Sequence, residues 1–211
     1  MGIYARLVLP RLVDWACGVG TITEQRDRIV PRASGRVLEL GIGSGLNLPL
    51  YDPREVEVVW GVDPSPELYR MAASRAAELP FPVRFFVRAA DEPGIPVAAG
   101  SIDTAVVTYA LCTIPDPVSA LREARRMLSP EGRLLFAEHG RSPDPAVRRW
   151  QERVGPVWSR MAGGCRLDRD PLAILEAAGF EVRELDTGYL PGWKPASWHY
   201  LGVAVPAVGV D

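Results

Sequence analysis

The sequence predicts an α/β protein with a doubly wound sheet of seven strands, mostly parallel with the last strand antiparallel, preceded by an N-terminal helical extension. From Arg36 onward, short runs rich in β-branched residues alternate with stretches of helical period, which is typical of βαβ units. Each of the longer helical stretches opens on a proline, a residue favoured in the first helical turn. The expected helices span residues 66–78, 117–128 and 171–178, and the expected strands span residues 37–40, 56–62, 83–87, 102–108, 133–138, 181–185 and 200–205.

The two ends of the chain depart from this alternation. About fourteen residues rich in Gly, Pro and Trp separate the last two expected strands without a helical period, which favours an antiparallel edge. At the start, Tyr4–Cys17 predicts a short amphipathic helix, and Thr21 with Glu24 has capping-box spacing for a second helix that Pro31 ends. We expect this extension to pack on its own domain; as a functional element it would form a lid over a site. Contact with a membrane surface is the alternative.

Length and composition restrict the class of protein. From the length of 211 residues we expect one domain. Residues 1–35 would form a helical lid, residues 36–140 the ligand-binding core, and residues 141–211 the acceptor-side helices and the final strands. With a net charge of −2 the chain has no overall positive field to attract the phosphates of a nucleic acid, so we expect no nucleic-acid partner. Two histidines and three cysteines without CxxC or HxxxH spacing predict no metal site. With no secretory signal pattern and no apolar run of about 20 residues, a cytoplasmic location is expected.

A glycine-rich turn follows the first expected strand. It begins two residues after Glu39 and contains Gly41, Gly43 and Gly45, which let the backbone approach a ligand closely. The second strand ends at Asp63, where an acidic residue usually accepts hydrogen bonds from ribose hydroxyls. Together these features predict an adenosine-type ligand over the carboxyl ends of the first two strands.

The spacing of the glycines distinguishes between cofactors. A dinucleotide fingerprint has the form GxGxxG, whereas this chain has GxGxG with an acid two positions before it, which disfavours a nicotinamide dehydrogenase. The pattern resembles motif I of class I S-adenosylmethionine (SAM) methyltransferases. The resemblance implies a Rossmann-like fold, SAM as the cofactor, and a position of Glu39 near the methionine amino group.

Three later segments resemble the same family in the expected order. Ala90 and Asp91 follow the third strand, where the family contacts adenine, and Thr108 to Leu111 should pass the methionine portion and the methyl group. Residues 120–136 resemble the helix, turn and fifth strand of the superfamily, with Glu131 in place of a glycine. The cofactor-binding residues that the resemblance implies are Glu39, Gly41, Gly43, Gly45, Asn47, Asp63, Pro64, Ala90, Asp91, Thr108 and Leu111.

Segments outside the cofactor motifs narrow the chemical class of the methyl acceptor. The segments LCTIPDP at 111–117, EHG after the fifth strand and GGCRL at 163–167 resemble a branch whose animal members are alkyl thiol methyltransferases. That resemblance implies a small acceptor, with a thiol favoured over the amino group of a phospholipid or small molecule at a membrane surface. The D/N-P-P-Y/F loop of base-amino methyltransferases is missing from the strand-four exit. A SAM-binding protein without catalysis is the alternative of a different class.

His139, at the carboxyl end of the fifth strand, is the only well-placed candidate for a general base or a substrate-orienting group; the alternative is a histidine that only hydrogen-bonds backbone at the strand end. A thiol has a pKa of about 8.5 and is already partly ionised near neutral pH, so it needs less help than an amine. Glu138 should point to the opposite sheet face and act structurally, because side chains alternate along a strand. Cys112 and Cys165 are expected to line the pocket or pack, since methyl transfer needs no covalent intermediate.

Overall fold

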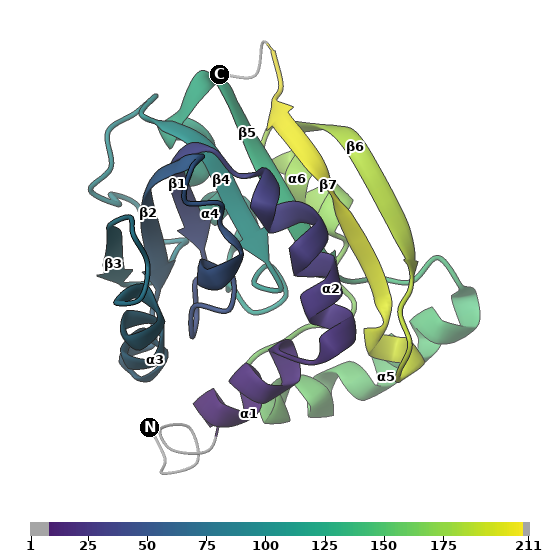
Figure 1. The fold of residues 1–211 in the computed structure, drawn as a ribbon. Helices are drawn as coiled ribbons and strands as arrows, with labels where there is room; N and C mark the ends of the chain where they lie inside the picture. Colours follow the sequence, from purple (N-terminus) through teal and green to yellow (C-terminus); the bar gives the residue numbers. More distant parts are fainter. Residues whose placement is uncertain (1–8, 209–211) are drawn as a thin grey trace.

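The computed structural model describes residues 9–208 and contains one seven-stranded sheet with the order β3-β2-β1-β4-β5-β7-β6. The first five strands are mutually parallel, and β7 runs antiparallel to both β5 and β6 (Figure 1). The predicted fold class is therefore confirmed. The strands are β1 (Gly35–Leu40), β2 (Val56–Asp63), β3 (Val83–Val87), β4 (Ile102–Thr108), β5 (Leu128–His139), β6 (Phe180–Tyr189) and β7 (Trp198–Pro206).

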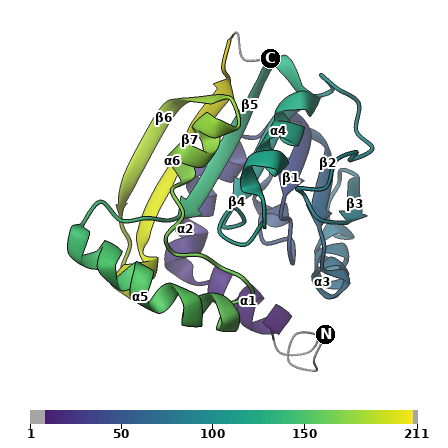
Figure 2. The same ribbon diagram turned by 180° about the vertical axis from the view of Figure 1, so that it is seen from behind.

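Helices cover both faces of the sheet. In Figure 1, α2 crosses in front of the strands, while α4 and α6 lie behind them and come to the front in Figure 2. Two buried apolar clusters correspond to these two faces, one around Phe136 and Leu121 and the other around Leu135 and Ile29. The helices are α1 (Leu9–Cys17), α2 (Gly20–Ile29), α3 (Pro66–Ala76), α4 (Pro117–Met127), α5 (Pro145–Met161) and α6 (Pro171–Ala177).

Four helices begin in the same way, with a polar cap followed by proline. The side chains of Ser65, Asp116, Asp144 and Asp170 each accept a hydrogen bond from a backbone amide in the first turn of α3, α4, α5 and α6. The proline that follows lacks an N–H and has a fixed φ that suits the helix. Three of these helices confirm the predicted ones within a residue or two at their ends.

The predicted capping box at Thr21 is wrong. Helix α2 begins at Gly20, its N-cap is Val19, and no side chain caps it. Only a tight turn separates α1 from α2, with the Gly18 amide bonded to Asp14 O at 2.9 Å, so the second helix starts before Thr21 can act as a cap. The part of the expected first helix before Leu9, including Tyr4, lies outside the described residues.

The carboxyl ends of the parallel strands meet at one edge of the sheet, and α1 and α5 lie beyond that edge in both views (Figures 1 and 2). Asp14 in α1 accepts hydrogen bonds from Ser44 Oγ at 2.5 Å and from Arg75 Nη1 at 3.1 Å. These contacts connect α1 to the glycine turn after β1. Within residues 9–208 no helix is long and apolar enough to cross a membrane.

Candidate active site

The glycine turn after β1 brings an open stretch of backbone to the sheet edge. Gly41, Gly43 and Gly45 all have positive φ, between +55° and +81°. A Cβ on Gly41 would lie 2.5 Å from Ala110 Cβ, and one on Gly45 would lie 2.8 Å from Leu48 Cδ1, so these two glycines permit close packing. A Cβ on Gly43 would meet nothing closer than 3.8 Å, which leaves room for a ligand against this part of the turn.

Asp63, at the end of β2, lies directly beside this turn. Its Oδ2 accepts the Gly43 amide at 3.1 Å and its Oδ1 accepts the Ser65 amide at 2.9 Å across Pro64. Burial raises the pKa of the Asp63 carboxyl, and the two amides oppose that effect. Each carboxyl oxygen keeps a further lone pair for a hydroxyl donor, as the predicted ribose contact requires.

Glu39 is buried and faces protein donors. Its Oε1 accepts Asn47 Nδ2 at 2.9 Å, and its Oε2 accepts the Tyr51 hydroxyl at 2.7 Å. Burial raises the pKa of Glu39 to about 7 despite these hydrogen bonds and the nearby Arg26 cation. Glu39 therefore orients Asn47 at the base of the turn, a positioning role that the motif alone did not indicate.

Arg26 of α2 reaches the same place and was missed by the sequence analysis. Its Nη1 donates to Asn47 Oδ1 at 2.8 Å and to the hydroxyl of Thr108 at the end of β4. The guanidinium also lies 4.9 Å from the centre of the Tyr109 ring. The sequence did contain a signal for a buried role of Arg26. Helical spacing places Arg26 on the same face as Ile22 and Ile29, which is the apolar face of the helix.

The exit of β4 is held by a buried acid on β5. Glu138 Oε1 accepts the backbone amides of Ala110 at 2.8 Å and Leu111 at 3.1 Å, a structural contact of the kind predicted for Glu138, while its buried Oε2 has no hydrogen-bond partner among the described residues. Tyr109 just before them has a φ of +53°, a conformation that costs a side-chain-bearing residue of order 1–3 kcal/mol. The amide contacts fix the segment that the resemblance places beside the methyl group.

The predicted adenine segment lies next to the β4 exit. Asp91 Oδ2 accepts the Asp116 amide at 3.1 Å, which joins the loop after β3 to the loop before α4, and the neighbouring Ala90 is buried. All the predicted cofactor residues thus belong to the turns and strand ends along one sheet edge. Their contact with a cofactor stays a prediction.

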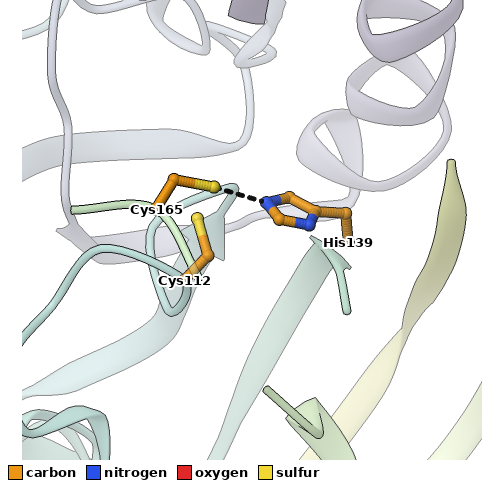
Figure 3. Close-up of side chains that lie close together, drawn as sticks. All are labelled: Cys112, His139 and Cys165. Atoms are coloured by element: carbon orange, nitrogen blue, oxygen red, sulfur yellow. Dashed lines mark hydrogen bonds between the residues drawn. The ribbon is translucent and has the colours of Figure 1, made fainter. Parts of the chain in front are cut away.

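Three residues with sulfur or imidazole side chains meet at this edge. Cys165, in the loop between α5 and α6, has its Sγ 3.3 Å from His139 Nε2, and Cys112 lies beside both (Figure 3). The hydrogen bond from Cys112, together with the one from His139, lowers the pKa of Cys165 to about 4. Burial opposes protonation of His139, but the hydrogen bond and charge of Cys165 together with the charge of Glu138 outweigh burial and raise the pKa of His139. Sequence analysis gave Cys112 and Cys165 a pocket-lining or packing role and did not foresee this contact.

The residues present fit SAM. A buried guanidinium with no carboxylate partner among residues 9–208 suits the methionine carboxylate, and Arg26 Nε is itself buried without a hydrogen-bond partner. The open backbone at Gly43 and the carboxyl of Asp63 suit the adenosine portion. Fold and site together define an α/β enzyme class that binds an adenosine-containing cofactor at the carboxyl edge of its sheet.

Comparison with known proteins leads to the same class of enzyme. A family model described as a methyltransferase domain matches residues 11–185. Human thiol S-methyltransferase TMT1B is 35% identical over 178 residues, covering 82% of this chain and 72% of the relative. A phosphatidylethanolamine N-methyltransferase from Cereibacter sphaeroides is 30% identical over 105 residues, covering 50% of this chain and 51% of the relative. A SAM-dependent methyltransferase structure from Methanosarcina mazei superposes with a TM-score of 0.61 at 21% identity, covering 82% of this chain and 92% of that one.

The chain therefore belongs to the methyltransferase domain family. It is a SAM-dependent methyltransferase with a class I, Rossmann-like fold.

Proposed function

We propose that this enzyme transfers the methyl group of SAM to the sulfur of a small thiol. The observation that carries the proposal is the meeting of Cys112, His139 and Cys165 directly after the β4 exit, where the acceptor is expected. An imidazole that carries a proton beside the acceptor can favour its thiolate form, which is the nucleophilic form. The similarity to thiol S-methyltransferase TMT1B over most of the chain supports the same acceptor class.

Arg26 is proposed to bind the methionine carboxylate. The guanidinium is 5% exposed, and its amide and hydroxyl partners, Asn47 and Thr108, carry no charge to neutralise it. An anionic group placed against Arg26 would gain a charge-assisted hydrogen bond in a buried environment. Asp63 would accept the ribose hydroxyls, and the loop bearing Ala90 and Asp91 would contact the adenine.

The chemistry asked of the protein is then mainly orientation. SAM supplies a methyl group already activated on a sulfonium, so the transfer is an in-line displacement that needs a correctly aimed nucleophile and the exclusion of water. Glu138 holds the β4 exit through two amides, and α1 lies over the glycine turn through Asp14. We propose that His139 favours ionisation of the acceptor thiol.

Methylation of a phospholipid or small-molecule amine at a membrane surface is the second candidate, supported by the partial similarity to the phosphatidylethanolamine N-methyltransferase. To separate the two, purified enzyme and radiolabelled SAM would be given either short alkyl thiols or phosphatidylethanolamine vesicles. We expect label in the thioether product and none in lipid. Turnover on vesicles without turnover on any thiol would reverse the order of the two candidates.

A further inference from the structure

Cys112, His139 and Cys165 form a compact group of metal-ligating side chains. One ligand atom from each lies within 4.8 Å of the others, and Figure 3 shows the sulfur atoms and the imidazole ring directed toward a common space. We propose that these three residues bind one Zn²⁺ ion and leave its fourth coordination position to the acceptor thiol. This inference rests on the proposed thiol methylation and specifies how the thiol is activated.

The separations suit tetrahedral zinc. Bond lengths of about 2.3 Å to sulfur and 2.0–2.1 Å to nitrogen imply sulfur–sulfur and sulfur–nitrogen separations of about 3.8 and 3.5 Å. The Cys165 Sγ–His139 Nε2 distance is 3.3 Å, and no pair of ligand atoms exceeds 4.8 Å. Small side-chain movements are enough to reach the tetrahedral values. Two cysteines and one histidine with an open fourth position form a ligand set that catalytic zinc sites use.

The backbone holds the ligands together. The Arg166 amide donates to Cys112 O at 3.0 Å, so the loop that carries Cys165 is bonded to the loop that carries Cys112. His139 is the last residue of β5 and is paired across the sheet with His199 of β7. Three segments far apart in sequence are thus fixed around one point before any ligand binds, which reduces the entropic cost of binding a metal.

Charge and chemistry also favour zinc. Two cysteine thiolates neutralise the 2+ charge, so a buried site carries no net charge before the acceptor binds. Zinc has no redox chemistry and so would not oxidise a bound thiol. Sequence spacing did not indicate a metal site because the three ligands lie in separate segments and form no short motif.

The site is placed to deliver a thiolate. Cys112 directly follows Leu111, whose segment is expected beside the methyl group of SAM. The acceptor R–SH would bind zinc through sulfur and release its proton to solvent. An S–CH₃ bond then forms as the sulfonium S–CH₃ bond breaks, with that electron pair remaining on the sulfur of S-adenosylhomocysteine. The neutral thioether product is a weaker ligand than the thiolate and leaves, while the zinc keeps its charge.

The first measurement is the metal content of the full chain, purified with its affinity tag removed and without chelators. We expect about one zinc per chain in the wild type, and loss of most of it in Cys112→Ser and Cys165→Ser. Cys17→Ser is the matched control: Cys17 in α1 lies near enough to Cys165 to interact with its charge but is not one of the three clustered ligands, so this variant should retain zinc. Circular dichroism and S-adenosylhomocysteine binding would verify that each variant is folded.

The second measurement uses cobalt in place of zinc. The Co²⁺ protein should show thiolate-to-cobalt charge-transfer absorption in the near ultraviolet and intense tetrahedral visible bands, and a short alkanethiol added without SAM should shift them. Chelated wild type should lose thiol methylation, keep S-adenosylhomocysteine binding, and regain methylation with zinc.

Each outcome bears on a separate step. Metal-free protein that is fully active would overturn the zinc site and leave His139 as a metal-independent base. If the metal is bound but its absorption spectrum does not change when thiols that the enzyme methylates are added, coordination of the acceptor by the metal is overturned. Bound metal with the expected thiol-dependent spectrum in an enzyme that methylates only amines would support the site while the proposed function fails.

Discussion

The Arg26 guanidinium donates a hydrogen bond of 2.8 Å to Asn47 Oδ1, joining a helix that precedes the sheet to the glycine turn within it. Asn47 Nδ2 donates in turn to Glu39 at 2.9 Å and to the Thr108 hydroxyl at 2.9 Å. One amide side chain therefore links α2, β1 and β4 at the expected methionine position. Arg26 is the cation of this network.

Replacing Arg26 should weaken cofactor binding. Arg26→Met removes a buried charged donor, and we expect the affinity for S-adenosylhomocysteine to fall about 10- to 100-fold, corresponding to about 1.4–2.8 kcal/mol. Arg28→Met on the same helix is the matched control, because Arg28 bonds to Asp186 and Gln25 away from the site. Calorimetry measures both. Equal affinities for the two variants would remove Arg26 from the cofactor site.

Glu39 should make the stability of the ligand-free protein pH-dependent. Its folded pKa is about 7, above the ordinary 4.5, because burial disfavours the charged form. The folded state therefore binds more protons between these values, and the Glu39 contribution, full below pH 4.5, is lost as pH rises through 7. Relative to Glu39→Gln, the wild type should lose up to about 3 kcal/mol between pH 5 and 8. Urea unfolding of both proteins across this range measures the difference, and parallel curves would contradict the buried titration.

Asp14 should slow the release of cofactor. Asp14→Asn removes the ion pair with Arg75 and weakens the bond to Ser44, so α1 is held less firmly over the glycine turn. We expect the dissociation rate of S-adenosylhomocysteine to rise about twofold to fivefold, as for a partly exposed ion pair. Stopped-flow fluorescence measures it, with the exposed Glu24→Gln as control. An unchanged rate would mean that α1 does not restrain the ligand.

Glu138 should support the fold through the β4 exit. Glu138→Ala leaves the buried amides of Ala110 and Leu111 without their acceptor and should cost about 3 kcal/mol of unfolding free energy. Glu138→Gln keeps an acceptor oxygen and should stay within about 1 kcal/mol of the wild type. Glu181→Ala, at an exposed ion pair on β6, should change stability by less than about 0.5 kcal/mol. Chemical denaturation compares the three, and equal losses for Ala and Gln at position 138 would contradict the acceptor role.

The sequence by itself determined the order of the strands and of most helices along the chain, the class of fold and the cofactor, whereas helix α5 (Pro145–Met161) was not among the expected helices. These depend on local signals: apolar periodicity, a proline after a capping Ser or Asp, and a glycine turn whose conformations only glycine adopts readily. Glu39, Gly43 and Asp63 could be found in this way because each occupies a fixed place relative to a strand end. The capping box at Thr21 failed because the preceding helix sets where α2 begins.

Only the tertiary structure decided which distant side chains meet. Arg26 lies 82 residues from Thr108, and Cys165 lies 26 residues from His139, and no local pattern encodes either contact. The packing of α2 on the sheet decides the first contact, and the bond between the Cys112 and Cys165 loops decides the second. The same chain that lacks any metal-binding motif in its sequence thus gathers two thiols and an imidazole at one point, because a folded sheet edge brings together the ends of segments that the sequence keeps apart.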